Sequence, residues 1–165
     1  MAVHTRAERD AQHLLDRLEM TEIPVDPIKV ARALGIEVWT SDLDRNVAGL
    51  LVRRKGRAPE IYVSAVDQPN RQRFTIAHEV GHFIERAAKG QAEEPVNQID
   101  YRDDVSSEGS NPREMYANGF AAALLMPAKQ LREYWKLNPD PEMLARKFKV
   151  SLVAMQHRLN NLDLR

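Results

Sequence analysis

Two histidines and a glutamate near the middle of the chain have the spacing of a metal-dependent hydrolase. His78 and His82 are four residues apart, and Glu79 directly follows the first histidine. Residues four positions apart project from one face of a helix, so both imidazoles can bind one metal ion. A carboxylate beside the first ligand can take a proton from water. The pattern predicts a zinc site of the HExxH type with Glu79 as the catalytic base.

The residues around this motif have the periodicity of a helix. With a turn of about 100° per residue, His82 lies roughly 40° from His78. The apolar residues fall on the opposite side of the predicted helix: Ile76, Val80, Phe83, Ile84 and Ala87. We therefore expect an amphipathic helix whose metal face is opposite its apolar face. Asn70 is the expected N-cap, and Gly81 is expected to let another backbone approach closely.

Catalytic zinc usually has three protein ligands and one open position, so a further ligand is expected outside the motif. Glu114 is the first candidate because it begins a second predicted helix, and Asn118 lies one turn further on the same face. Asn118 would then hydrogen-bond the other ring nitrogen of a ligand histidine. Asn111 with Glu114 also fits a capping box, so other third ligands stay open. These are Asp100, Asp103, Asp104, Glu108 and His157.

The composition is that of one globular domain over residues 1–165, with 43% hydrophobic and 29% charged residues. Cysteine is absent, so any metal must bind histidine and carboxylate groups. The formal net charge of zero argues against a broad basic surface for nucleic acid. No apolar run reaches membrane-spanning length, and the first ten residues lack the apolar segment of a signal peptide. We expect a cytoplasmic protein with no membrane partner.

The elements that position the motif predict an α+β fold. An amphipathic helix is expected from Val3 to Met20, and a short one after Asp26, which is the expected cap. Strand-like runs lie at 36–40, 49–53 and 60–64, and a polar hairpin at 54–59 joins the last two. We expect a small three-stranded sheet packed on a zincin-like HExxH helix, with helices before and after it. An edge strand beside that helix is expected to pair with the substrate backbone.

The segment from Lys89 to Asn111 is polar and acidic, and it is predicted to be a mobile loop. It is either a solvated connector, which is the simpler interpretation, or a segment that covers the cleft or favours a basic substrate. Asn111 is the expected cap of the next helix, which ends before Pro127.

The subregion 141–162 has the spacing of two short helices around a turn, with Ser151 capping the second helix, as in helix-turn-helix DNA readers. Five Lys or Arg stand against two acids from Pro141 to Arg165. This excess is modest for phosphate binding. DNA binding is therefore a lesser alternative, and it would depend on residues such as Arg158.

The segments 73–82 and 114–127, RFTIAHEVGH and EMYANGFAAALLMP, closely resemble the two signature blocks of the ImmA/IrrE family of metallo-endopeptidases. The order of the upstream elements is also similar, so the resemblance spans nearly the whole chain. It implies that Glu114 is a zinc ligand. It also implies cleavage of an Xre-type helix-turn-helix repressor, which releases genes for mobile-element transfer or for stress and DNA-damage responses.

The implied mechanism has His78, His82 and Glu114 holding Zn²⁺, while Glu79 takes the proton of the attacking water and passes it to the departing amine. A donor to the developing oxyanion is also expected. The candidates are Tyr62, Tyr101, Tyr116 and His157. The alternative function is a repressor-binding or DNA-binding regulatory protein with little intrinsic proteolysis.

Overall fold

The computed structural model describes residues 3–102 and 111–165. Its strands are β1 (Glu37–Ser41), β2 (Val47–Arg53), β3 (Glu60–Ser64) and β4 (Val96–Tyr101). They form one mixed sheet in the order β1-β3-β2-β4, in which β1 is parallel to β3 and the other pairs are antiparallel. The α+β prediction is correct, but the sheet has four strands and not the three that were expected.

The additional strand, β4, lies inside the segment from Lys89 to Asn111 that was predicted as a loop. Its two aliphatic residues, Val96 and Ile99, are an odd number of positions apart, so they lie on opposite faces and give no alternating pattern. The strand forms because its backbone pairs with β2, a contact that local sequence does not encode. The later part of the segment, which contains Asp103, Asp104 and Glu108, lies outside the described residues.

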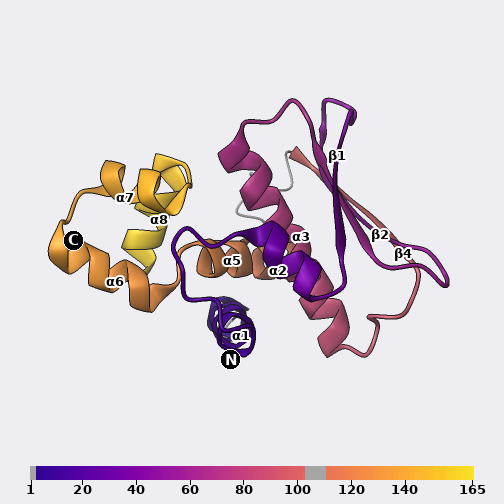
Figure 1. Cartoon of the computed structure of the whole chain (residues 1–165), viewed down its shortest axis with the longest axis horizontal. Helices are drawn as coiled ribbons and strands as arrows, with labels where there is room; N and C mark the ends of the chain where they lie inside the picture. The colour runs from indigo at the N-terminus through magenta and orange to yellow at the C-terminus, as the bar shows by residue number, and fades with distance from the viewer. Residues whose placement is uncertain (1–2, 103–110) are drawn as a thin grey trace.

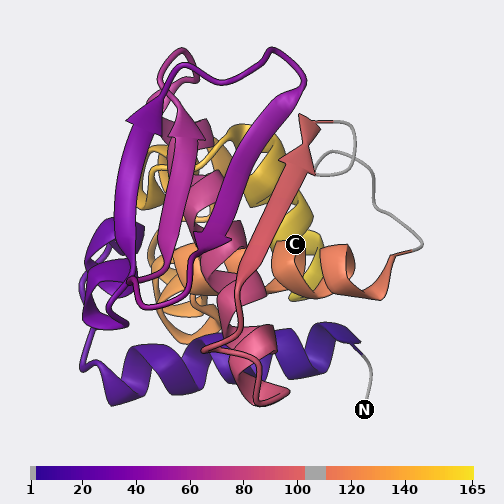
Figure 2. The same cartoon turned by 90° about the vertical axis from the view of Figure 1, so that its right-hand side faces the viewer.

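Seven helices are described, and they all lie on one side of the sheet (Figures 1 and 2). They are α1 (Val3–Arg17), α2 (Pro27–Ala33), α3 (Pro69–Ala88), α5 (Pro112–Leu125), α6 (Ala128–Leu137), α7 (Pro141–Phe148) and α8 (Leu152–Asn161). Helix α3 packs against β2 and β3, and α5 packs against both α3 and α1. The HExxH motif therefore lies at the centre of the molecule, between the sheet and α5.

The predicted caps are correct at three helices and wrong at one. Asp26, Asn111 and Ser151 each accept a backbone N–H bond at the start of α2, α5 and α8. Helix α3 instead begins with Pro69, and Gln68 is its N-cap without a side-chain bond. The expected cap Asn70 therefore lies inside the first turn, because proline is well suited to the first helical position.

Helix α3 is buried on more than the one face that its sequence predicted. Every residue from Thr75 to His82 is buried, because the sheet covers one side and α5 covers the other. Gly81 permits the second contact, since an added Cβ would lie 3.2 Å from the Cα of Ala117 on α5. The expectation that Gly81 admits another backbone is confirmed, and the histidines belong to a buried face and not to an open surface.

Two arginines attach the C-terminal helices to the rest of the fold. Arg73 of α3 donates to the carbonyl of Val25 at 2.8 Å and to that of Lys149, after α7, at 3.1 Å. Arg158 of α8 is 5% exposed and donates to both carboxylate oxygens of Glu8 on α1, at 2.6 and 2.7 Å. The lesser alternative, DNA binding through residues such as Arg158, has no support at this residue, because its guanidinium is buried and paired within the protein.

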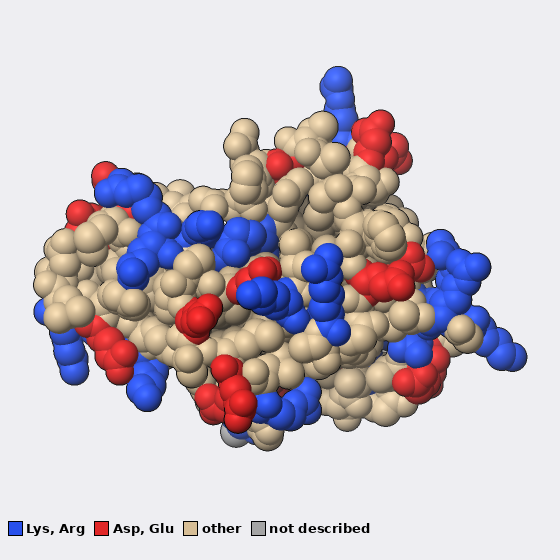
Figure 3. All heavy atoms as spheres, in the orientation of Figure 1, with Lys and Arg blue, Asp and Glu red and all other residues tan. Residues whose placement is uncertain are grey.

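Acidic and basic side chains are interspersed on the face shown in Figure 3. This mixing agrees with the formal net charge of zero. Across the part of the chain that the structure describes, no helix is both long and apolar enough to cross a membrane.

Candidate metal centre

Four buried side chains from three elements meet between the sheet and α5. His78 and His82 come from α3, Asp100 from β4, and Glu114 from the first turn of α5. One ligand atom of each lies within 4.8 Å of the others. Sequence spacing pointed to His78, His82 and Glu114, and the structure brings them together with Asp100, which was one of the alternative third ligands.

The distances within this cluster fit one small cation. The Nε2 atoms of His78 and His82 face each other at 3.1 Å. The carboxylate of Glu114 lies 3.2 Å from the first and 3.0 Å from the second, and that of Asp100 lies 3.6 and 3.5 Å away. Ligands at about 2.0–2.1 Å from a tetrahedral zinc ion are roughly 3.3 Å apart. Two nitrogens and two carboxylates therefore surround a position suited to a divalent metal.

Asn118 orients one of the histidines. Its Oδ1 lies 2.8 Å from Nδ1 of His78, so Nδ1–H donates to the amide oxygen and the lone pair of Nε2 is directed into the cluster. Asn118 is one turn after Glu114 on α5, as the sequence spacing indicated. The geometry is that of an outer residue that fixes the tautomer and the ring plane of a metal ligand.

Glu79 lies beside the cluster under β2. It is fully buried, and neither of its carboxylate oxygens has a hydrogen-bond partner. A Cβ at Gly49 of β2 would lie 3.0 Å from Oε1 of Glu79 and 2.6 Å from Cγ2 of Thr75. Only glycine therefore lets β2 pass this close to α3. Sequence reasoning missed Gly49, although a glycine inside a strand often marks such a close approach.

The charges of the cluster shift its pKa values in opposite directions. Burial is the main reason that the pKa of Glu79 is raised well above its usual value, and Asp100 adds to the effect. Burial acts to lower the pKa of His78, but Asp100 and Glu114 outweigh it and raise that pKa to about 9. Without a cation, a proton on His78 therefore balances part of the negative charge, and a divalent metal would replace it.

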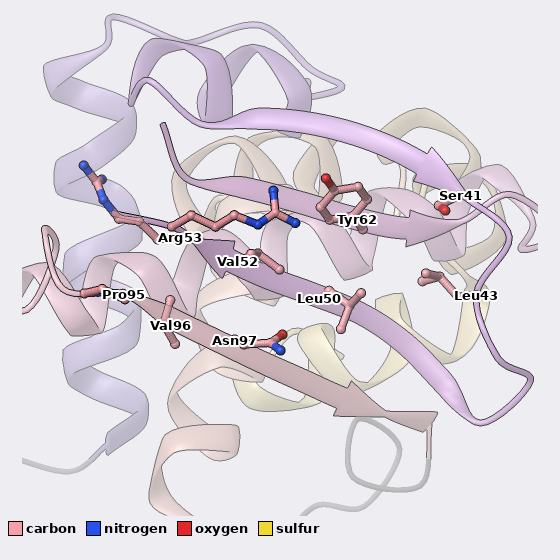
Figure 4. Close-up of a pocket in the computed structure, with 10 residues that line it drawn as sticks. Ser41, Leu43, Leu50, Val52, Arg53, Tyr62, Pro95, Val96 and Asn97 are labelled. Atoms are coloured by element: carbon pink, nitrogen blue, oxygen red, sulfur yellow. The ribbon is translucent and has the colours of Figure 1, made fainter. Parts of the chain in front are cut away.

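The residues proposed as oxyanion donors do not join this cluster. Tyr62 lies on the opposite face of the sheet (Figure 4). The hydroxyl of Tyr116 donates to Asp10 at 2.8 Å. Tyr101 and His157 are exposed, and neither belongs to the metal cluster. The oxyanion role thus has no support from the position of any of these four side chains.

The model of peptidase family M78, described as an IrrE N-terminal-like domain, matches residues 31–160. This range contains the whole cluster, Glu79 and Asn118. No curated protein matches the chain.

A solved structure of a Mycobacterium tuberculosis transcriptional regulator is similar to this chain, with a TM-score of 0.58 and 21% sequence identity. The match covers 95% of this chain and 46% of that one, so the chain spans about half the length of the solved protein. At this identity the likeness shows the fold.

Proposed function

Since the chain belongs to the family of IrrE N-terminal-like peptidase domains, we propose that it is a zinc-dependent endopeptidase that cleaves a helix-turn-helix repressor. The family match supports a metallopeptidase-type role. The observation that carries the proposal is the buried cluster of His78, His82 and Glu114, with the Glu79 carboxylate beside it.

The donor set suits zinc. Imidazole nitrogens and carboxylate oxygens are ordinary zinc ligands in hydrolases, and the chain has no thiolate to offer. In this proposal His78, His82 and Glu114 hold the ion, and Asn118 keeps His78 in the required tautomer. Zinc held there would polarise the scissile carbonyl and make water a stronger acid.

Glu79 is the proposed general base and acid. Its carboxylate would take a proton from the attacking water and deliver it to the departing amine nitrogen. Burial raises the pKa of Glu79 in the metal-free chain, and the positive charge of a bound cation would favour the ionised carboxylate, which is the form that accepts a proton. Its carboxylate is buried under β2, where a Cβ at Gly49 would lie 3.0 Å from Oε1, so close packing holds it beside the cluster.

The proposed substrate is an Xre-type repressor in the cytoplasm, whose cleavage would release mobile-element or stress and DNA-damage response genes. Support comes from the resemblance of segments 73–82 and 114–127 to the ImmA/IrrE signature blocks. The solved protein of similar fold is titled a transcriptional regulator, and that description is in keeping with a role in gene control.

The test is cleavage of purified Xre-type repressors from the same organism, with zinc supplied, by the native chain and by Glu79→Gln. The native chain should give two defined fragments, and Glu79→Gln should bind the repressor without cutting it. Equal cleavage by both proteins would contradict the role of Glu79, and an intact repressor after prolonged incubation with the native chain would contradict endopeptidase activity in this form.

A repressor-binding regulator with little intrinsic proteolysis is the second candidate. The observation in its favour is the burial of the cluster, in which His78, His82 and Asp100 are all at most 3% exposed. In the part of the chain that the structure describes, such a cluster offers little surface to a substrate. The native chain and Glu79→Gln would then both bind the repressor stably and release it from its operator without cutting it. This result would favour the regulator over the endopeptidase.

A further inference from the structure

Strand β4 brings Asp100 to the metal cluster through its register with β2. Gly49 of β2 is the partner of Asp100, and Val47 is the partner of Tyr101, so Ala48 is an extra residue that forms a bulge. The burial of β4 alternates, with Asp100 buried and Tyr101 exposed. A shift of one residue would turn Asp100 away from the cluster.

Strand β4 occupies one edge of β2 at the residue that lies over the proposed catalytic base. Gly49 lies directly over Glu79 and has the Asp100 backbone as its pairing partner on the other side. An extended peptide commonly binds by adding a strand to such an edge. Here the chain's own strand takes the backbone hydrogen bonds that a substrate would use.

Four side chains of the cluster could bind a metal, and four is the number of protein ligands in a closed site. Catalytic zinc keeps one position open, whereas structural zinc has four protein ligands. The carboxylate of Asp100 directs one oxygen toward each histidine, at 3.6 and 3.5 Å, as Glu114 does at 3.2 and 3.0 Å. Asp100 therefore fills the fourth corner of the cluster.

We propose that Asp100 is a fourth metal ligand that closes the site, and that β4 thereby lies in the place of the substrate and inhibits the enzyme. The proposal rests on the proposed peptidase function. Binding of the repressor, or of another protein that pairs with β2, would have to displace β4 before cleavage.

The attachment of β4 is suited to displacement. Its side chains that face the helices are Val96, Gln98 and Asp100, and Val96 is the one apolar residue among them that packs against the core. Gln98 accepts a hydrogen bond from Arg113 at 2.9 Å, and Ile99 on the other face is 39% exposed. A strand held mainly by backbone pairing and polar contacts opens at lower cost than the core of a protein.

The first measurement uses the Co²⁺-loaded chain, whose visible spectrum reports the ligands, and acetohydroxamate as a small chelating probe. In the native chain the probe should leave the spectrum unchanged at concentrations that saturate an open site. In Asp100→Ala it should shift the spectrum, and the affinity for Co²⁺ should fall by roughly tenfold or more. Asn97→Ala, an exposed neighbour on β4, is the control and should behave as the native chain does.

The second measurement compares cleavage of the repressor by the zinc-loaded proteins at saturating zinc. Asp100→Ala should cleave the repressor on the order of tenfold faster than the native chain and Asn97→Ala do. The metal loses its fourth ligand in this variant, and β4 loses its bond to the metal. Asp100→Asn keeps the shape of the side chain and provides the same comparison if the alanine variant does not fold.

Three results would overturn the proposal. A native spectrum that shifts with acetohydroxamate as readily as that of Asp100→Ala would show that Asp100 does not close the site. A native spectrum that Asp100→Ala and Asp100→Asn leave unaltered would show that it is not a ligand. Slower cleavage by both variants would show that Asp100 assists the reaction. Failure of the proposed peptidase function would give a different result. Neither the native chain nor any variant would cleave the repressor, but acetohydroxamate would still shift the spectrum of Asp100→Ala and not that of the native chain.

Discussion

His78 must exchange a proton for a cation when the cluster binds a metal. The carboxylates of Asp100 and Glu114 outweigh the effect of burial and raise the pKa of His78 to about 9 in the metal-free chain. The folded chain therefore holds this proton at neutral pH. Metal ligands must be neutral imidazoles, so the proton competes with the metal at every pH below that value.

The first prediction is that metal binding at pH 7 releases about one proton from His78 and becomes about tenfold tighter per pH unit up to about pH 9. The affinity rises with pH because the competing protonated form becomes less populated. Calorimetric titration with zinc in two buffers of different ionisation enthalpy gives the number of protons. Binding without proton release would contradict the protonated state of His78.

The second prediction concerns the hydrogen bond between Asn118 and His78. Asn118→Ala should weaken zinc binding by about 10- to 100-fold, because His78 loses the hydrogen bond that fixes its tautomer and ring plane. Competition with a chromophoric chelator measures the affinity. Asn160→Ala on α8, where the side chain is exposed, is the matched control. Equal zinc affinity in Asn118→Ala and in the control would show that Asn118 does not support the metal site.

At the scale of elements, the sequence predicted what local patterns encode. The caps Asp26 and Asn111 and the hairpin at 54–59 depend on neighbouring residues, and the structure has them. Strand β4 was missed because pairing with β2 forms it, across more than 40 residues of chain. For the same reason the sequence indicated Glu114 more clearly than Asp100. Glu114 follows a recognisable cap on a helix, whereas the position of Asp100 depends on the register of the sheet.

The close approach of β2 to α3 leads to the third prediction. Gly49→Ala should lower the free energy of unfolding by about 1–3 kcal/mol, because its Cβ would meet Cγ2 of Thr75 at 2.6 Å. It should also reduce cleavage, since β2 must move away from Glu79. Urea unfolding and the repressor assay measure the two effects.

Gly56→Ala provides the comparison for Gly49. Gly56 has a φ of +74° and no atom within 4 Å of an added Cβ, so alanine there strains only the hairpin backbone. Cleavage should stay at the native rate although stability falls. Native stability and native cleavage in Gly49→Ala would contradict the packing argument.

At the scale of the whole molecule, two arginines join the C-terminal helices to the peptidase site's supporting helices. Arg73 donates to the carbonyl of Val25, before α2, and to the carbonyl of Lys149, after α7. Arg158 binds Glu8 and the carbonyl of Met126. These contacts give subregion 141–162 a structural role in the molecule. The subregion has the two short helices that its spacing predicted. Arg158 is buried and paired with Glu8, so it is not available to contact DNA.

The fourth prediction concerns this attachment. Arg158→Leu should lower the free energy of unfolding by about 1–3 kcal/mol, because it leaves Glu8 and the Met126 carbonyl without their charged donor. A double-mutant cycle with Glu8→Gln, followed by urea unfolding, isolates the pair. Effects that add to within about 0.5 kcal/mol would contradict a direct contribution from the ion pair.

Zinc binding by His78, His82 and Glu114 is tested by measuring the metal content of the purified protein after zinc loading. The native chain and His13→Ala, a variant of an exposed histidine on α1, should each hold about one zinc ion per chain. His82→Ala and Glu114→Ala should lose it after dialysis. A native chain that holds no zinc, or variants that keep all of it, would contradict a zinc site formed by these three residues.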